Sequence, residues 1–446
     1  MKTSKSNPTS IFVILALIVV PVTFTGAAWA AVPERVPASF DGADGNLPTG
    51  LSIDAAGNLW GVTAEGGTGD CTQEKRVGCG TVFELTPTSG GWAAKSIYSF
   101  QGGSDGANPT GSLTFDTDGN VYGTTGAGGF GYGTVYELLP QSGGYQETVI
   151  YAFNDTATHN DGVGPRAGLV MDSAGNLYGT TGSGGNGCSL SCGTVFEVSP
   201  AAGGWTESIL YNFKGPVGAT DGWSPFGSLI LDGEGNLYGT TSAGGTGNCS
   251  GSTGCGVVFE VSPGAGGGWT ETILYNFQGV SAHVHDGARP YTGMVFDGAG
   301  NLYGTTLYGG NGACNDRLGC GAVFELSPAG GGAWTETVIH AFSGPDGYFP
   351  NGLAISAAGN LYGTTGYGGI YNFGAALELV AGSGGTWSEN RLHSFGNGKD
   401  GQVPSTSMVF DSAGNLYGAT SFGGAHVTLA CGNAPTGCGT VFQLKP

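Results

Sequence analysis

The amino-acid sequence predicts an all-β protein, a seven-bladed β-propeller whose blades are four-stranded antiparallel sheets. Three observations support this prediction. A phrase exemplified by GNLYGTTGSGG at residues 175–185 recurs seven times, at intervals of 55–65 residues. Each interval contains four short runs typical of strands, and the two ends of the chain are complementary fragments of one unit.

The third unit illustrates the four strands that we expect in each blade. They are GLVMD, NLYGTT, GTVFEVSP and WTESILYNF, between residues 168 and 213. Val, Ile, Tyr, Phe and Thr favour strands, and the Gly, Pro, Asn and Asp between the runs favour turns. No run in the rest of the unit has the period of a helix. The unit is therefore expected to be a small sheet.

The two chain ends indicate how the ring closes. The last unit ends at GTVFQLKP, its third strand, whereas residues 32–40 have the length and the final Phe of a fourth strand. We expect this first segment to complete the last blade, which leaves no open sheet edge. An open β-solenoid is the alternative, but it gives no reason for the ends to be complementary.

The turn between the first two strands reads Asp-x-x-Gly-Asn in six units, and Ser356 replaces the Asp in the sixth unit. An Asp here caps backbone N–H groups, and the Gly adopts positive φ. A calcium loop is the alternative, but the motif has too few carboxylates for one. We expect the Tyr of the following LYG to pack between blades, and its Gly to let backbones approach closely.

Charge and the N-terminus limit the partners and the location. The 446-residue chain has a formal net charge of −20, which repels nucleic-acid backbones and anionic lipids. Residues 1–30 combine two lysines, an apolar stretch and an Ala-Trp-Ala cleavage site, as in a secretory signal peptide. An uncleaved membrane anchor is the alternative. We expect residues 31–446 to form one secreted or periplasmic propeller domain, monomeric and without a membrane span.

All ten cysteines lie between the second and third strands of five units. The two units without cysteines have the shortest loops there, so we interpret the pairs as disulfides that staple long loops of an exported protein. Zinc or redox chemistry is the alternative, but no pair has Cys-x2-Cys spacing or a neighbouring His ligand. The predicted pairs are Cys71–Cys79, Cys188–Cys192, Cys249–Cys255, Cys314–Cys320 and Cys431–Cys438.

The cysteine loops should share one face of the ring with the connections between blades, and we call this the cysteine-loop face. An Asp-Gly-x-x-Pro motif precedes the innermost strand of every unit on this face. Its carboxylates either cap a turn, which we favour, or form a ring near the channel mouth that could hold a cation such as Ca²⁺. They are Asp44, Asp105, Asp161, Asp221, Asp286, Asp346 and Asp400.

Aromatic residues that do not recur between units are candidates for stacking on sugar rings, with packing between loops as the alternative. These candidates are Trp223, Tyr291, Tyr308, Tyr348, Tyr367, Phe130 and Tyr132. His283 and His285 form an unusual cluster that could share a metal ion. His340 and His393 replace a strand-four Tyr, so we interpret them as structural. No other cofactor is expected.

The unit GNLYGTTGSGGNGCSLSCGTVFEVSPAAGGWTESILYNFKG resembles the GloVer (Gloeobacter–Verrucomicrobia) tandem repeat of exported bacterial proteins, and the resemblance covers nearly all of residues 31–446. DSAGNLYG is also similar to the turn of NHL-type propellers. The resemblance implies an exported propeller, often at the cell surface, in a family for which no enzymatic activity is established.

We therefore expect a non-catalytic binding or scaffold propeller that recognises extracellular glycan, or another surface ligand such as a protein, through the cysteine-loop face. The alternative is a propeller enzyme of polysaccharide lyase, glycosidase or lactonase type, acting in the periplasm or outside the cell. The sequence has no nucleophile elbow, zinc-protease motif or phosphate-cradling loop, which favours the binding protein.

Overall fold

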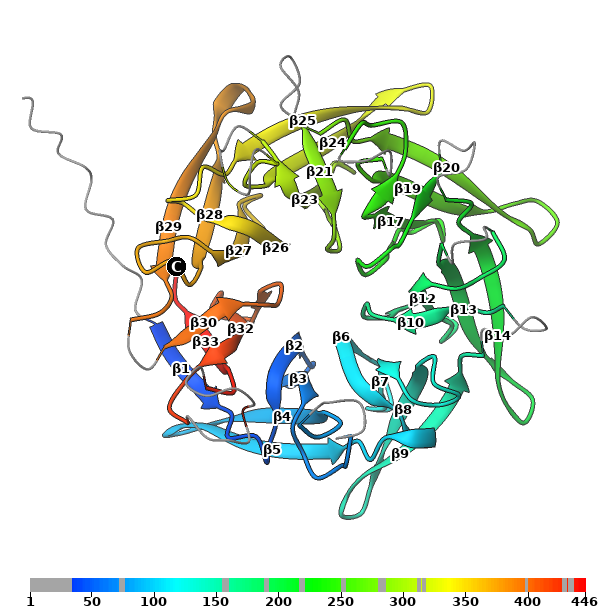
Figure 1. The fold of residues 1–446 in the computed structure, drawn as a ribbon, viewed down its shortest axis with the longest axis vertical. Helices are drawn as coiled ribbons and strands as arrows, with labels where there is room; N and C mark the ends of the chain where they lie inside the picture. Colours follow the sequence, from blue (N-terminus) through cyan, green and yellow to red (C-terminus); the bar gives the residue numbers. More distant parts are fainter. Residues whose placement is uncertain are drawn as a thin grey trace, which may run out of the picture.

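A computed structural model shows strands arranged in blades around a central axis (Figure 1). It describes residues 34–71, 77–154, 160–187, 192–215, 221–249, 254–279, 286–310, 314, 318–397, 400–426, 431 and 437–446. The predicted signal peptide, Cys188, His283 and His285 lie outside the described residues. In the described part of the chain, no helix is long and apolar enough to cross a membrane.

Blades one, two and six are antiparallel sheets whose four strands follow chain order from the axis outward. Their strands are β2 (Asn46–Ile53), β3 (Leu59–Glu65), β4 (Thr81–Thr88) and β5 (Gly91–Ser99); β6 (Ala107–Phe115), β7 (Val121–Ala127), β8 (Thr134–Gln141) and β9 (Gly144–Ala152); β26 (Tyr348–Ile355), β27 (Leu361–Tyr367), β28 (Ala375–Ala381) and β29 (Trp387–Ser394).

In blades three, five and seven the innermost strand is interrupted, and both of its parts pair with the second strand. These blades contain β10 (Val163–Pro165), β11 (Val170–Met171), β12 (Leu177–Ser183), β13 (Thr194–Ala201) and β14 (Gly204–Asn212); β21 (Gly287–Pro290), β22 (Val295–Phe296), β23 (Leu302–Gly309), β24 (Ala322–Gly330) and β25 (Ala333–Ala341); β30 (Gly401–Pro404), β31 (Val409–Phe410), β32 (Leu416–Gly423), β33 (Thr440–Leu444) and β1 (Glu34–Ser39).

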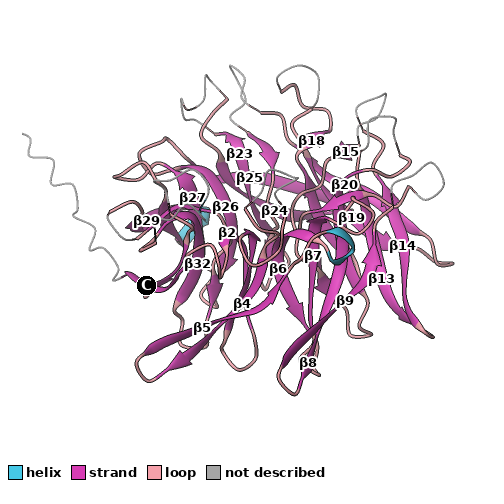
Figure 2. Ribbon diagram, turned by 60° about the horizontal axis from the view of Figure 1, so that its bottom comes forward, coloured by secondary structure: helices cyan, strands magenta, loops and turns pink. Residues whose placement is uncertain are grey.

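In blade four, both the first and the second strand are interrupted. One short pair is separate from the remaining four-stranded sheet. The short pair is β15 (Gly222–Trp223) with β18 (Ala243–Gly244), and the sheet contains β16 (Ile230–Leu231), β17 (Leu237–Thr241), β19 (Val257–Pro263) and β20 (Trp269–Asn276). Figure 2 shows β15 and β18 at one face of the ring and the β4–β5 and β8–β9 hairpins at the other.

The N-terminal strand closes the ring, as the sequence predicted. β1 pairs antiparallel with β33 and brings Glu34 opposite Leu444 and Ser39 opposite Thr440. Phe40, directly after β1, is 2% exposed and packs on Phe83 of blade one. The last blade is thus built from both ends of the chain (Figure 1).

Aromatic rings pack between neighbouring blades at a recurring position. The Phe that ends each outermost strand packs on a third-strand side chain of the next blade, at a centroid distance of 4.8–5.1 Å where that side chain is aromatic. These pairs are Phe40–Phe83, Phe100–Tyr136, Phe153–Phe196, Phe213–Phe259, Phe277–Phe324 and Phe395–Phe442. The Gly of LYG makes room for the third-strand ring, because a Cβ at Gly179 would collide with Phe196. The position where a Cβ would stand at this Gly is therefore occupied by an aromatic ring.

The Asp-x-x-Gly-Asn turn is capped by its Asp, which confirms the turn interpretation. In blade three, Asp172 Oδ1 accepts the backbone N–H groups of Ala174 and Asn176 at 2.9 Å. Asp172 Oδ2 accepts the Tyr178 hydroxyl at 3.0 Å, and Gly175 has a φ of +84°. The Tyr178 ring packs on Trp269 of the next blade, so each turn also orients a ring at a blade interface.

Candidate functional site

Four of the five predicted disulfides are present, and Cys188 of the fifth lies outside the described residues. Each bridge links two cysteines within one loop between the second and third strands. The second cysteine of each bridge is buried, and a single Gly separates it from the third strand. The bridges therefore fix the loops of the cysteine-loop face to the body of the ring.

The residue before the Pro of each Asp-Gly-x-x-Pro motif, which we call the pre-proline position, has a left-handed backbone with φ of +56° to +64°. Its N–H donates to the preceding blade: Arg289 N–H to the Cys255 carbonyl at 2.7 Å, and Phe349 N–H to the Cys320 carbonyl at 3.2 Å. The seven positions thus share one backbone geometry, although their side chains differ. They are Leu47, Asn108, Gly164, Ser224, Arg289, Phe349 and Val403.

The Asp side chains of the same motif lie between blades. Asp221 accepts hydrogen bonds from the Tyr211 hydroxyl at 3.0 Å and from the Lys214 backbone N–H at 2.8 Å. Asp105, Asp161 and Asp286 make equivalent bonds to a strand-four Tyr, and Asp346 and Asp400 contact a His at that position. Asp44 instead accepts the N–H of Asp41 at 2.8 Å. Because six of these carboxylates contact the outermost strand, they join blades rather than point as one group to the axis.

A strand-four Glu of the following blade completes each of six arrangements, which we call interblade triads. The triads are Tyr98–Asp105–Glu147, Tyr151–Asp161–Glu207, Tyr211–Asp221–Glu271, Tyr275–Asp286–Glu336, His340–Asp346–Glu389 and His393–Asp400–Glu34. Burial and the nearby Asp raise the pKa of the Glu, to about 7 for Glu207 and about 8 for Glu336. In five of the triads the sequence signal for this Glu is its place two residues after the Trp or Tyr near the start of strand four, and our sequence interpretation did not use it.

The axis of the ring contains a cavity of about 310 Å³ lined by the innermost strands of all seven blades. Most of its lining is Gly, Ser, Thr and Asn. Arg166, Phe226 and Tyr291 are its large side chains. The Arg166 guanidinium lies 5.7 Å from the Phe226 ring centroid, and the Phe226 and Tyr291 centroids are 4.7 Å apart. The cavity therefore offers hydroxyl and amide groups beside two rings and one cation.

Three of the predicted aromatic candidates come together with Phe349 across blades five and six, and we call this group the Tyr308 cluster. The Tyr308 ring lies 5.5 Å from Phe349, and the rings of Tyr348 and Tyr367 stack at 5.3 Å. The Arg289 guanidinium lies 5.5 Å from the centroid of Tyr308. Tyr367 is 37% exposed, so the cluster reaches the surface. Two pre-proline side chains, from Arg289 and Phe349, contribute to it.

The other aromatic candidates are placed separately. Trp223 is half-buried and packs with the core between blades three and four, and Tyr132 packs with the core between blades two and three. Phe130 is 68% exposed in the short loop of blade two. Tyr291 lines the axial cavity, as described above. The structure thus brings together only some of the residues that the sequence placed on this face.

A second hollow, of about 680 Å³, lies on the opposite face between blades six and seven. It occurs where Ser356 replaces the turn Asp of the other units. Glu378 takes over the side-chain bonds of that Asp, accepting the Tyr362 hydroxyl at 2.6 Å and the Asn360 amide at 3.0 Å, while Ser356 Oγ accepts the Asn360 backbone N–H at 3.2 Å. Our sequence interpretation noted Ser356 but predicted no hollow there. The exchange of Asp for Ser in a turn does not by itself show whether neighbouring side chains fill the space that the larger carboxylate occupies in the other units.

Seven antiparallel blades around an axial cavity define the class of protein as a β-propeller. The chain belongs to the Gloeobacter/Verrucomicrobia repeat family, whose pattern matches residues 32–251 and 248–446. No match was found among curated proteins.

Two solved structures are similar to this chain at low sequence identity. A catalytically inactive virginiamycin B lyase from Staphylococcus aureus, crystallised with quinupristin, is 13% identical with a TM-score of 0.52, over 93% of this chain and 99% of that chain. A protein of unknown function from Dyadobacter fermentans is 13% identical with a TM-score of 0.46, over 93% of this chain and 99% of that chain. At 13% identity the similarity to the lyase supports the fold alone.

Proposed function

We propose that this propeller is an exported, non-catalytic binding module that binds neutral glycans through its cysteine-loop face. The Tyr308 cluster is the observation that supports this proposal most directly. It combines four rings from two blades with the Arg289 guanidinium, and the backbone N–H groups of Arg289 and Phe349 donate to the carbonyls of two disulfide-bonded cysteines. Such a surface is already ordered before a ligand arrives, which lowers the cost of binding.

The chemistry of the face fits a sugar. Aromatic ring faces stack on the C–H faces of pyranose rings, and the Tyr hydroxyls and Arg289 supply hydrogen bonds to sugar hydroxyls. The axial cavity, which Asn351 lines two residues after Phe349, adds further hydroxyl and amide groups. The net charge of −20 disfavours acidic polysaccharides, so we propose neutral ones.

The position of the carboxylates supports binding over hydrolysis. A glycosidase needs two carboxyl groups on either side of the scissile bond. None of the residues lining the axial cavity has a carboxyl group, and six of the seven motif carboxylates are engaged between blades. The four disulfides support export, because such bonds persist in oxidising compartments.

A glycan-binding screen on the exported protein, followed by calorimetry on the best ligand, tests the proposal. Tyr308→Ala combined with Tyr367→Ala should weaken binding at least about tenfold, which corresponds to about 1.4 kcal/mol. Phe130→Ala is the matched control, since it removes an exposed ring from the equivalent loop of blade two. An equal loss of glycan affinity in the double variant and in Phe130→Ala would contradict the assignment of the site to the Tyr308 cluster. Release of shortened glycan, detected by mass spectrometry, would favour the enzyme alternative.

A further inference from the structure

Two of the six interblade triads contain a His where the other four contain a Tyr. In the Tyr triads the hydroxyl donates a hydrogen bond to the Asp, for example Tyr275 to Asp286 at 3.0 Å. A Tyr hydroxyl is a hydrogen-bond donor at neutral pH, so it satisfies the carboxylate beside it. An imidazole offers a nitrogen lone pair at the same place, and this changes what the triad can bind.

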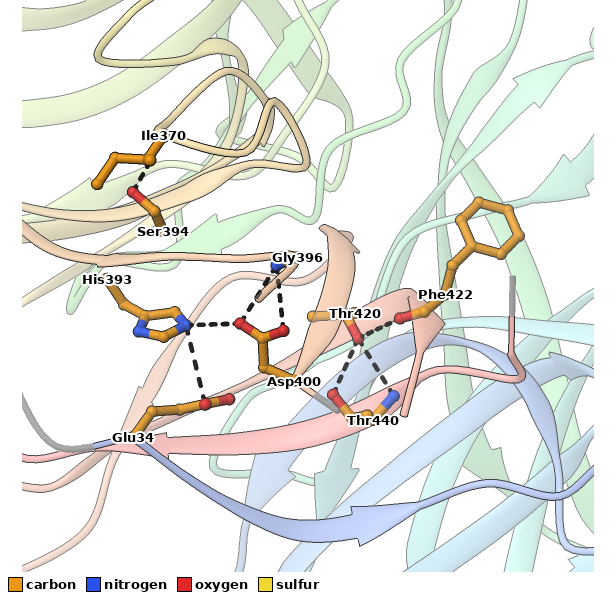
Figure 3. A network of polar contacts seen from close by, with 9 residues as sticks. All are labelled: Glu34, Ile370, His393, Ser394, Gly396, Asp400, Thr420, Phe422 and Thr440. Atoms are coloured by element: carbon orange, nitrogen blue, oxygen red, sulfur yellow. Dashed lines mark hydrogen bonds and ion pairs between the residues drawn. The ribbon is translucent and has the colours of Figure 1, made fainter. Parts of the chain in front are cut away.

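The triad of Glu34, His393 and Asp400 gathers one nitrogen and two carboxylate oxygens at a small site (Figure 3). His393 Nε2 lies 3.1 Å from Asp400 Oδ2 and 3.8 Å from Glu34 Oε2. Three protein ligands around one Zn²⁺ at about 2.0–2.2 Å are separated by about 3.3 Å in tetrahedral geometry. The two separations from His393 Nε2 bracket this value, and all three ligand atoms lie within 4.8 Å of one another.

The surroundings hold the three side chains in place. The Gly396 N–H lies 3.2 Å from both carboxylate oxygens of Asp400, and the His393 ring packs edge-on against Phe395 at 4.8 Å. Glu34 Oε1 is buried and has no hydrogen-bond partner, as is also true of the Glu in each of the four Tyr triads. The side chains of Glu34, His393 and Asp400 are 14%, 15% and 6% exposed. A cation bound between His393 Nε2, Asp400 Oδ2 and Glu34 Oε2 would balance the charge of the two clustered carboxylates.

The second His triad, His340 with Asp346 and Glu389, is less suited to a cation. Its separations are similar, at 3.4 Å from His340 Nε2 to Asp346 and 3.8 Å to Glu389, so the difference lies in the surrounding charge. The Arg391 guanidinium also acts electrostatically on Glu389. No Lys or Arg in the described part of the chain forms an ion pair with Glu34 or Asp400. The chain therefore contains a near-identical cluster that serves as an internal comparison.

We propose that Glu34, His393 and Asp400 bind a divalent transition-metal ion, best fitted by Zn²⁺, with water in the fourth position. Imidazole and carboxylate together suit Zn²⁺, whereas Ca²⁺ and Mg²⁺ prefer oxygen ligands alone. The ligands come from the N-terminal strand β1, from β29 of blade six and from the connection to blade seven. The ion fastens the strand that closes the ring to the two blades beside it.

Zn²⁺ titration of the untagged, metal-free mature protein against a chromophoric chelator tests the site. His393→Tyr is the decisive variant, because it recreates the triad that four other interfaces already contain and so preserves a proven packing. It should weaken Zn²⁺ binding at least about 100-fold, since even residues that only orient a ligand cost 10- to 100-fold. Glu34→Gln should do the same without changing side-chain size, and His340→Tyr should leave binding unchanged.

Thermal unfolding gives a second readout. Free Zn²⁺ at 100 times Kd should raise the Tm of the native protein by about 3 °C and leave that of His393→Tyr unchanged. Hydrogen exchange of residues 34–39 should slow on Zn²⁺ addition in the native protein only. The proposal is wrong if His393→Tyr binds Zn²⁺ as tightly as the native protein, if only His340→Tyr loses binding, or if Zn²⁺ leaves the native Tm unchanged.

Discussion

Replacing Phe40 by Ala should destabilise the protein by about 3–5 kcal/mol, because it removes a fully packed ring from the blade that closes the propeller. Phe40 is 2% exposed, lies 4.9 Å from the Phe83 ring and packs in a core that also contains Leu51 and Val441. A domain of about 415 residues has an unfolding entropy of about 0.9 kcal/mol per degree. The expected fall in Tm is therefore about 4 °C.

Differential scanning calorimetry of the mature protein measures this effect. Val36→Ala is the matched control, because Val36 lies in the same strand but is 38% exposed, and it should shift Tm by about 0.5 °C. Removal of residues 31–42 should expose the edge of β33 and cause aggregation. A Tm change below about 1 °C for Phe40→Ala would refute the reasoning. Such a result would mean that the N-terminal strand and its Phe40 ring contribute little to the stability of the folded ring.

Stability should fall as pH rises from 5 to 9, because burial raises the pKa of four interblade glutamates in the folded protein. They are Glu147 and Glu336, at about 8, and Glu207 and Glu271, at about 7. Each binds its proton more tightly folded than unfolded, so its contribution is complete below about pH 4.5 and is lost as pH passes 7 to 8. After solvent screening we expect each Glu to change the free energy of unfolding, measured in urea, by about 1 kcal/mol over this pH range. The fall in stability with pH should be shallower for Glu207→Gln. A stability that rises with pH would contradict this account. Non-reducing peptide mapping should find five bridges, each within one loop, and no free thiol. A bridge between units, or zinc bound to the thiols, would overturn the disulfide interpretation.

The blade count, the closure and the capped turns were predictable because each depends on a local pattern. Asp172 and Asn176 form their turn from residues four apart, so the sequence contains the whole interaction. Ring closure was predictable from the ends, since residues 32–40 match the strand that the last unit lacks. The disulfides followed from the same logic, because each pair lies within one loop.

The interblade contacts were not predictable, because they join residues that only the ring brings together. The residue before a Pro normally prefers an extended backbone, yet Phe349 and Val403 adopt positive φ. Hydrogen bonds to the preceding blade impose this conformation. The triad of Glu34, His393 and Asp400 likewise forms only in the closed ring, since Glu34 lies at the other end of the chain from the other two residues. Only the structure therefore separates Tyr291, at the cavity, from Trp223, in the core.

The antiparallel pairing of β1 with β33 also determines how the propeller responds to force. Glu34 lies opposite Leu444, so the first described residue and the C-terminal end leave the ring at the same corner. A force that pulls the two termini apart loads the hydrogen bonds of this pair sequentially, in an unzipping geometry, rather than all at once in shear. We therefore expect the ring to open first at this pair when its two termini are pulled apart.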